Sequence, residues 1–273
     1  MRTSRIVLIS LLLIGMSVQA QKIYIRAGLG AAVTTAANIE FNSTQSPDYT
    51  TNQVSTKKAG LGTGLPFVLA AGYKLSENFR IELGVDYFYG FFIKTKDIMQ
   101  TSTFDSKYHG QMLSIVPAIV MTFPIDKFHP YARLGLKLGV MNSVVYQDKR
   151  VQTILPEKAT ETTTESKIKE YGGIAIGAQA ALGTDYAIND KISLFGEIQL
   201  DGISYSPKHG KYTEYSVDGA DQMASRTKNE NNWNFLKDVD FNKIIPDDQP
   251  DELPRVNFRF GNVGLVVGVK YTL

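Results

Sequence analysis

The chain has 273 residues, no cysteine, three histidines and a formal net charge of +2. The absence of cysteine excludes disulfides and thiolate metal sites, and the near-neutral charge gives no indication of a nucleic-acid partner. The 43% hydrophobic content and slightly negative mean hydropathy are compatible with a soluble protein or a membrane barrel, because the two faces of a barrel strand cancel in such an average.

The N-terminus has the parts of a secretory signal. Two arginines precede the apolar run 6–16, and Val18-Gln19-Ala20 supplies small residues for a signal peptidase. The run is shorter than the roughly 18 apolar residues that a membrane anchor needs. We therefore predict a signal peptide over 1–20 and a single mature domain over 21–273.

Several segments of the mature chain alternate between apolar and polar residues with the period of a β-strand. In one of them, apolar residues from Phe79 to Tyr89 alternate with Arg80, Glu82 and Asp86. The other segments with this alternation are 23–33, 65–75, 113–123, 132–140, 174–186, 192–201 and 263–273. The total of about eight matches strands that cross a bilayer at a tilt, and no run after the signal is long and apolar enough for a transmembrane helix.

The connections between these segments alternate in length. Short links occur at 75–78, 124–129 and 189–191, and long ones at 39–59, 94–108, 147–169 and 207–253. Short turns on one side and long loops on the other are typical of outer-membrane barrels with an even number of strands. The sequence predicts an all-β fold: a closed antiparallel up-and-down transmembrane β-barrel of about eight strands with its long loops outside the cell.

A secreted lipocalin-like barrel is the main structural alternative, since it also has eight strands but turns its apolar face inward. Here the polar face carries paired opposite charges interleaved with glycines, which suits a closed lumen. Aromatic residues also gather near the strand ends, as expected of two interfacial girdles. These are Tyr73, Phe123, Tyr186 and Tyr271 toward the short turns, and Tyr89, Phe91, Tyr146 and Tyr205 toward the long loops.

The polar face of the strands predicts what lines the lumen. The strands that run outward carry ionic residues there, namely Arg26, Glu82, Asp86, Arg133, Lys137, Glu197 and Asp201. The returning strands contribute mostly small residues, namely Ala70, Gly72, Ser114, Ala118, Ala175, Gly177, Ala181 and Gly264. Eight strands enclose little more than side chains, and an unpaired buried charge is costly. We expect a filled lumen in which Glu82, Arg133 and Glu197 form one ionic layer; the alternative is a transport path lined by these charges.

The sequence contains little that points to chemistry at a site. His109, His129 and His209 lack metal-ligand spacing, and no nucleophile elbow, P-loop or zinc motif occurs. Asp247, Asp248, Asp251 and Glu252 include the ligand types of a calcium site, but their spacing favours a solvated acidic loop over 246–254. The segment 147–169 is expected to be a polar surface loop or a strand extension beyond the membrane. We predict no catalytic residue, metal or cofactor.

The last six residues resemble the C-terminal signal of outer-membrane barrels, with Gly268, the aromatic Tyr271 and the final hydrophobe Leu273. Together with the signal peptide and the strand pattern, they make the chain similar to the superfamily of small OmpA-, OmpX- and OmpW-like barrels of Gram-negative bacteria. That resemblance implies a location in the cell outer membrane, contact with outer-membrane lipid, and recognition of the closing strand by the barrel-assembly machinery.

Three functions remain open at this level. The first is a non-enzymatic barrel that supports the envelope or binds external ligands through its long loops. The second, which an OmpW-like resemblance allows, is a narrow porin-like conduit for small or hydrophobic solutes. The third is a barrel enzyme acting on lipid or peptide, which is the least favoured because the motif search finds so little chemistry.

Overall fold

The computed structural model describes residues 23–273 apart from 36–37, 46–51, 100, 124 and 155–159. The predicted signal peptide lies outside the described residues. None of the helices in the described part of the chain reaches the length and apolarity needed to cross a bilayer.

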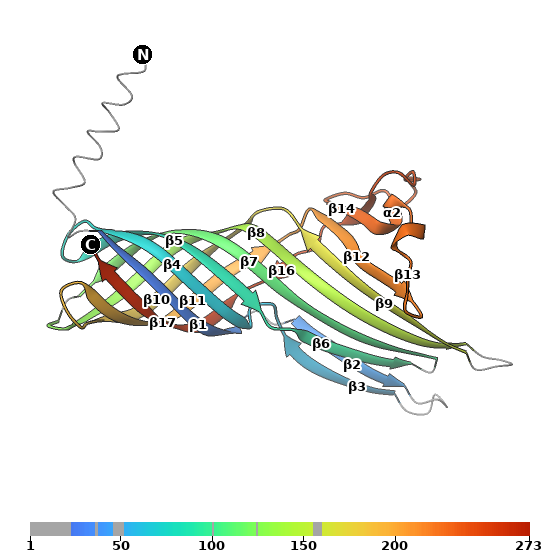
Figure 1. The fold of residues 1–273 in the computed structure, drawn as a ribbon, viewed down its shortest axis with the longest axis horizontal. Helices are drawn as coiled ribbons and strands as arrows, with labels where there is room; N and C mark the ends of the chain where they lie inside the picture. Colours follow the sequence, from blue (N-terminus) through green and yellow to red (C-terminus); the bar gives the residue numbers. More distant parts are fainter. Residues whose placement is uncertain (1–22, 36–37, 46–51, 100, 124, 155–159) are drawn as a thin grey trace, which may run out of the picture.

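Eight antiparallel strands close into a barrel (Figure 1). Going round the wall, they are β1 (Ile23–Thr34), β4 (Gly64–Lys74), β5 (Phe79–Gly90), β7 (Ser102–Thr122), β8 (Phe128–Ile154), β10 (Ala175–Ala187), β11 (Ile192–Tyr205) and β17 (Asn262–Thr272). Each strand pairs with the next, and β17 pairs back with β1 from Tyr24↔Thr272 to Thr34↔Asn262. Closure leaves no free strand edge, which a sheet in lipid requires. The predicted fold is confirmed.

Three tight turns join the strands at the end of the barrel where both termini of the described chain lie. They fall at 75–78, 123–127 and 188–191, close to the predicted short links. The side-chain oxygen of Asn189 accepts hydrogen bonds from the backbone N–H groups of Lys191 and Ile192, at 2.9 and 2.8 Å. This Asx turn explains why a link of four residues suffices there.

The long connections at the other end are mostly not loops, and that part of the prediction is wrong. They form further strands and two short helices: β2 (Asn38–Gln45), β3 (Asn52–Ala59), β6 (Ile93–Met99), β9 (Thr160–Tyr171), β12 (His209–Val217), β13 (Ala220–Asp221), η2 (Met223–Ser225), α2 (Lys228–Asn231), β14 (Asn232–Leu236), β15 (Asp251–Pro254) and β16 (Phe258–Arg259). For 147–169 the expected strand extension is the correct alternative, since β8 and β9 pair from Ser143↔Tyr171 to Ile154↔Thr160.

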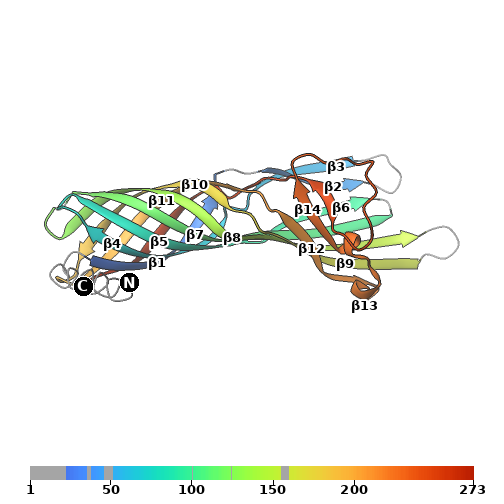
Figure 2. The same ribbon diagram turned by 90° about the horizontal axis from the view of Figure 1, so that it is seen from above.

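These strands extend the barrel wall into one continuous sheet, here called the distal sheet, in the order β3-β2-β6-β7-β8-β9-β12-β14-β15. Its centre is made by the same β7 and β8 that span the barrel, which have 21 and 27 residues. Figure 2 shows the barrel and the distal sheet end to end along one long axis.

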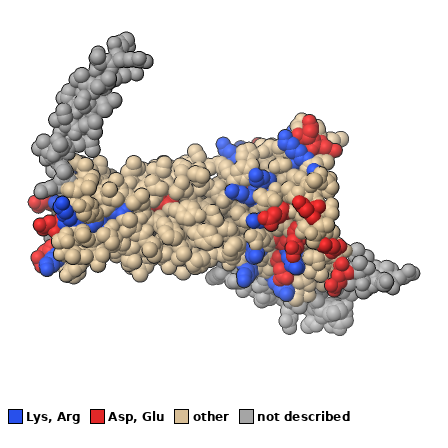
Figure 3. Space-filling view, in the orientation of Figure 1, with Lys and Arg blue, Asp and Glu red and all other residues tan. Residues whose placement is uncertain are grey.

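The outward face of the barrel is apolar. Leu29, Leu83, Leu134, Leu182 and Leu265 all have at least 58% of their surface exposed, while their neighbours in sequence point into the lumen. Figure 3 shows a belt almost free of charged side chains between two charged ends. An exposed apolar belt of this kind needs lipid around it, so the lipocalin-like alternative, with its apolar face inward, is excluded.

Candidate functional site: a filled lumen and an extended outer sheet

The candidate site is the barrel interior, and the alternation along the strands positions its side chains. Because successive strand residues point to opposite faces, the apolar residues that face lipid leave every second position for the lumen. All seven ionic residues expected in the lumen are at most 7% exposed there: Arg26, Glu82, Asp86, Arg133, Lys137, Glu197 and Asp201.

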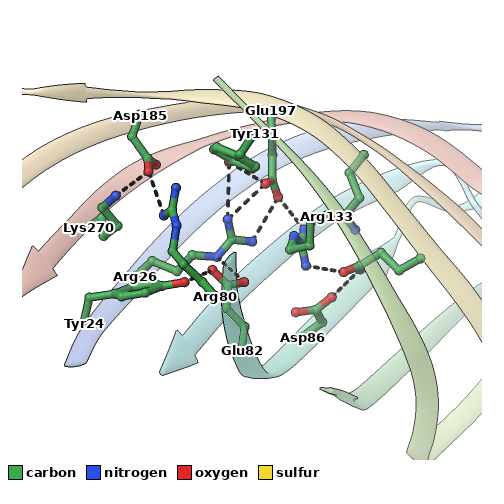
Figure 4. A network of polar contacts seen from close by, with 12 residues as sticks. Tyr24, Arg26, Arg80, Glu82, Asp86, Tyr131, Arg133, Asp185, Glu197 and Lys270 are labelled. Atoms are coloured by element: carbon green, nitrogen blue, oxygen red, sulfur yellow. Dashed lines mark hydrogen bonds and ion pairs between the residues drawn. The ribbon is translucent and has the colours of Figure 1, made fainter. Parts of the chain in front are cut away.

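Glu197 is the centre of the main cluster (Figure 4). Its two carboxylate oxygens accept hydrogen bonds from both terminal nitrogens of Arg26, at 3.0 and 3.1 Å. Arg133 donates to Glu197 at 2.6 Å, and the Tyr131 hydroxyl donates at 2.7 Å. On its other side, Arg26 Nε lies 3.4 Å from Glu82. A bidentate arginine pair with further donors satisfies the buried carboxylate well.

The expected single layer of Glu82, Arg133 and Glu197 is therefore only partly right. Arg133 contacts Glu197 directly, but Glu82 is joined to them through Arg26 and also accepts a hydrogen bond from Tyr24 at 2.7 Å. The reason is that Arg26 projects between the two glutamates from β1, and its long side chain reaches both.

A second cluster lies nearer the distal sheet, around Lys137. Its ammonium group contacts Asp201 at 2.6 Å and Asp86 at 3.5 Å. Gln179 donates to Asp86 at 2.7 Å and accepts from Arg133 at 2.5 Å, so it joins this cluster to the central one. The two clusters form one continuous polar network.

A third cluster at the short-turn end was missed in the sequence. Asp185 accepts a hydrogen bond from Arg80 at 2.9 Å and pairs with Lys270. Arg80 lies two residues before Glu82 on β5, so the alternation of polar and apolar residues could have predicted that it also faces the lumen. Asp185 and Lys270 lie on returning strands, where small residues dominate and single charges are easily overlooked.

Hydrogen bonds of the network reach over the strand that separates their partners, because that strand carries a small residue at the crossing point. Gly72 of β4 lies between Tyr24 and Glu82 in the register, and a Cβ atom there would be 2.2 Å from Cζ of Tyr24. Ala181 of β10 lies likewise between Arg133 on β8 and Gln199 on β11. Small returning-strand residues thus make room for the long ionic side chains.

Charge in the lumen is balanced. The buried charged residues of the described chain are five cations, Arg26, Arg80, Arg133, Lys137 and Lys270, and five anions, Glu82, Asp86, Asp185, Glu197 and Asp201. Each of these ten takes part in at least one ion pair. Pairing of this kind is what makes burial of so many charges tolerable.

An apolar layer, here called the plug, closes the lumen where the barrel meets the distal sheet. Its buried members are Ala32, Leu61, Phe88, Ile93, Met112, Val144, Ala175, Ile203, Tyr205 and Phe260. The Phe260 ring packs edge-on against Phe88 and Tyr205, with centroids 6.4 and 6.3 Å apart. Gly110 allows this, since a Cβ atom there would be 2.4 Å from the Phe260 ring. The plug was not predicted, because its residues interrupt the polar pattern of the inward face.

The girdle at the short turns includes outward-facing Phe123, Tyr186 and Tyr271, at 51, 39 and 41% exposure. At the other end, Tyr89 and Phe91 face outward as expected. Tyr146 and Tyr205 do not belong to that girdle, and their assignment was wrong. Tyr205 is fully buried in the plug and Tyr146 packs against it, because both occupy inward positions of their strands.

The remaining candidate residues are dispersed. His109 packs beside Phe92 and Tyr89, His129 lies at a short turn, and the His209 ring packs at a tilt against that of Tyr171. Among the described residues no three histidine or carboxylate side chains come together as metal ligands. Glu252 pairs instead with Lys243 at 2.5 Å, and Asp251 begins strand β15.

Gly268, Tyr271 and Leu273 lie on or just after β17, the strand that closes the barrel. Gly268 pairs with Gly28 of β1 and with Phe195 of β11. Tyr271 faces lipid, and the backbone N–H of Leu273 donates to the Ile23 carbonyl at 2.9 Å. The structure thus ties the chain's last residues into both neighbouring strands.

A closed barrel with an apolar belt, aromatic residues at its borders and a charge-balanced interior defines a small transmembrane β-barrel. The family model of the outer membrane protein β-barrel domain matches residues 7–224, most of the chain. The chain therefore belongs to this family, and it resides in the cell outer membrane with its distal sheet at the surface.

Comparisons with individual proteins are more distant. Neisserial surface protein A (NspA) has 12% identity and a TM-score of 0.35, over 92% of this chain and 97% of that one. Ail, the attachment invasion locus protein of Yersinia pestis, has 9% identity and a TM-score of 0.29, over the same shares of the two chains. A search of curated protein sequences gives no significant match.

Proposed function

We propose that this protein is a non-conducting, non-enzymatic surface barrel whose task is to hold the distal sheet above the outer membrane as a binding surface. The observation that carries the proposal is the lumen, which is occupied by the polar network and then by the plug. A narrow conduit would need a continuous water path, whereas ten charged side chains and the plug fill the interior of only eight strands.

The distal sheet supports the binding part of the proposal. It is built from strands continuous with the barrel wall, so its side chains are held on a rigid element, which favours recognition over loop flexibility. The lumen carboxylates are held in ion pairs, and Glu197 already accepts from Arg26, Arg133 and Tyr131. This arrangement is suited to structural support and favours a non-enzymatic role for the lumen residues described here.

Single-channel recording in planar bilayers distinguishes a non-conducting surface barrel from a narrow porin-like conduit. We expect the full chain to insert without conductance steps. As a positive control, Arg26→Ala with Phe260→Ala removes the connector of the network and the centre of the plug, and the inserted double variant should produce measurable steps. Clear steps from the unaltered chain would favour the conduit.

Binding is tested separately with arrays of glycans and proteins probed by the detergent-folded protein. The full chain is compared with a variant in which 94–107 and 147–167 are each replaced by a two-residue turn. Retention of a ligand by the full chain alone would support the binding surface. Equal retention by both forms would place recognition elsewhere in the molecule.

A further inference from the structure

The outer face of the distal sheet carries lysines directly above the aromatic girdle. Cross-strand partners lie on the same face of a sheet, so the register sorts these residues into rows. The row nearest the membrane is His109, Val145, Lys169 and Lys211, the next is Lys94, Lys107, Gln147, Lys167 and Glu214, and the third is Lys96, Asp105, Lys149, Glu165 and Ser216.

The charge on this face changes with height. The two rows nearest the membrane hold five lysines and one glutamate, whereas the third holds two lysines and two acids. In the third row the ammonium of Lys96 lies 3.8 Å from Asp105 and that of Lys149 2.8 Å from Glu165. Positive charge that acids do not neutralise is therefore concentrated toward the lipid.

Contacts with aromatic rings place two of these lysines, Lys107 and Lys211, at headgroup level. The Lys107 ammonium lies 5.8 Å from the centre of the Phe92 ring, and the Lys211 ammonium lies 5.6 Å from that of Tyr171. Exposed aromatic side chains at the end of the apolar belt mark the interface between hydrocarbon and headgroups. Lys167 is paired with Glu214 at 2.9 Å, but no carboxylate among the described residues pairs with Lys94, Lys107, Lys169 or Lys211.

The second and third rows border a hollow. A depression of about 690 Å³ is lined by Lys94, Lys107 and Lys167 and by residues of the third row, together with Glu214 and Asp148. Figure 3 shows basic and acidic side chains gathered over this end of the molecule, beyond the uncharged belt. The hollow is large enough for a phosphate group with part of the sugar or glycerol that carries it.

We infer that the four lysines without an acidic partner, Lys94, Lys107, Lys169 and Lys211, bind the phosphate groups of an anionic lipid in the outer leaflet. Each is a compact cation on a flexible stem, and Lys107 and Lys211 keep their ammonium groups beside aromatic rings near the membrane border. A phosphate group at the interface would supply the negative charge that compensates these lysines, since no acid on this face pairs with them. The inference does not depend on whether the distal sheet binds an external ligand.

Lipid binding to the folded full chain in detergent tests the inference. Bisphosphorylated lipid A is the probe, and bound lipid is measured by native mass spectrometry. Lys107→Gln with Lys169→Gln should weaken binding by roughly thirtyfold, which corresponds to about 1 kcal/mol for each lysine near an anionic surface. The pair Lys127→Gln with Lys191→Gln makes the same charge change in the short turns, at the opposite end of the barrel, and should alter binding less than about twofold.

Further arms separate the lipid from other anions. Lipid A without its phosphates should bind the unaltered chain and the Lys107/Lys169 variant equally weakly. Inorganic pyrophosphate at equal concentration should not displace the lipid. A second pair, Lys94→Gln with Lys211→Gln, repeats the test on different strands in case the first variant fails to fold. Unchanged binding in the folded variants, an equal loss in the control, or displacement by pyrophosphate would overturn the inference.

Discussion

At the scale of single residues, Arg26 connects the two halves of the central cluster. It contacts Glu82 on β5 and Glu197 on β11 from its place on β1. Glu197 in turn holds Arg133 on β8. One arginine thus relates four of the eight barrel strands through side chains, in addition to the backbone hydrogen bonds of the wall.

The pair of Arg133 and Glu197 gives the first stability prediction. Breaking a fully buried pair leaves its partner unpaired, so Arg133→Ala should lower the free energy of unfolding by about 3–5 kcal/mol. Urea unfolding in lipid vesicles measures this. The double variant with Glu197→Ala should lose less than the sum of the two single changes, because the second removes the orphaned charge.

An exposed pair provides the matched control. Lys96 and Asp105 are 3.8 Å apart with more than half of each side chain exposed, so Lys96→Ala should cost only about 0–1 kcal/mol. If Arg133→Ala were equally mild and additive with Glu197→Ala, the lumen would be wet and the packed network would be the wrong description.

Glu170 on β9 gives a prediction about pH. Its Oε2 atom is buried without a hydrogen-bond partner, between Val144 and Gly210 in the register. Burial raises the pKa of Glu170 to about 7 from an ordinary value of 4.5. The folded state therefore binds this proton more tightly, and the resulting stabilisation is full below about pH 4.5 and lost as pH rises through 7.

We expect the distal sheet to be about 1–2 kcal/mol more stable at pH 5 than at pH 8, a reduced figure because solvent still reaches part of the side chain. Hydrogen exchange of the β9 and β12 amides measures the difference. Glu170→Gln should abolish it, whereas Glu165→Gln, at an exposed pair, should leave it unchanged. A pH dependence that survives Glu170→Gln would assign it to another group.

The residues of the lumen were predictable where alternation was strong. Glu82, Arg133 and Glu197 lie in strands where both sequence neighbours are apolar, so the two-residue period of a strand is enough to predict that their side chains face the lumen. Asp185 and Lys270 were missed because single charges on strands rich in small residues carry little periodic signal. Which charges pair was not predictable, since that depends on strand order and on how far Arg26 extends.

At the scale of elements, β17 both ends the chain and closes the wall. Thr272 donates its backbone N–H to the Lys191 carbonyl at 2.8 Å, and Leu273 donates to Ile23 at 2.9 Å. Removal of Tyr271–Leu273 takes away both bonds and an outward aromatic at the interface. We expect export of the truncated chain but a marked loss of folded barrel in the outer membrane.

Heat-modifiable migration of the outer-membrane fraction measures this assembly, and periplasmic fractionation confirms export. Tyr271→Phe keeps the ring and serves as the control that should assemble normally. Normal assembly of the truncated chain would show that the last residues do not act as the closing-strand signal.

The distal strands show why the long connections were mistaken for loops. Strands with polar residues on both faces lack the alternation that a lipid-facing strand must have, so segments such as β9, TETTTESKIKEY, look like surface loop by composition. They are strands because β7 and β8 continue past the membrane and offer a paired edge on which β6 and β9 add hydrogen bonds. Strand formation in these segments is thus determined by the neighbouring strand and cannot be predicted from the sequence of the segment alone.

At the scale of the whole molecule, the barrel and the distal sheet differ in what stabilises them. The barrel is closed and surrounded by lipid, whereas the distal sheet is open-edged and stands in water. Segments 94–107 and 147–167 can each be replaced with a two-residue turn. The turns would join Ile93 to Tyr108 and Tyr146 to Ile168, and the two residues of each pair already lie opposite one another on adjacent strands. The plug and the polar network keep all their members.

We expect this shortened chain to fold and insert as the full chain does, with unchanged heat-modifiable migration, because the eight-strand closure is intact. Deletion of Gly84 alone within β5 is the control that should abolish folding, since it shifts the rest of the strand by one residue and exchanges its lipid-facing and lumen-facing side chains. Failure of the shortened chain to fold would show that the distal sheet takes part in forming the barrel.

The length of β8 has a mechanical consequence. Its 27 residues run from the short turn at Phe128 to Ile154, roughly 90 Å at about 3.3 Å per residue. A load applied at its far end is carried along one covalent strand into the barrel wall, where it acts in shear on many hydrogen bonds at once rather than peeling them one by one. We therefore expect β8 to resist a pull along its length more strongly than a pull across the sheet.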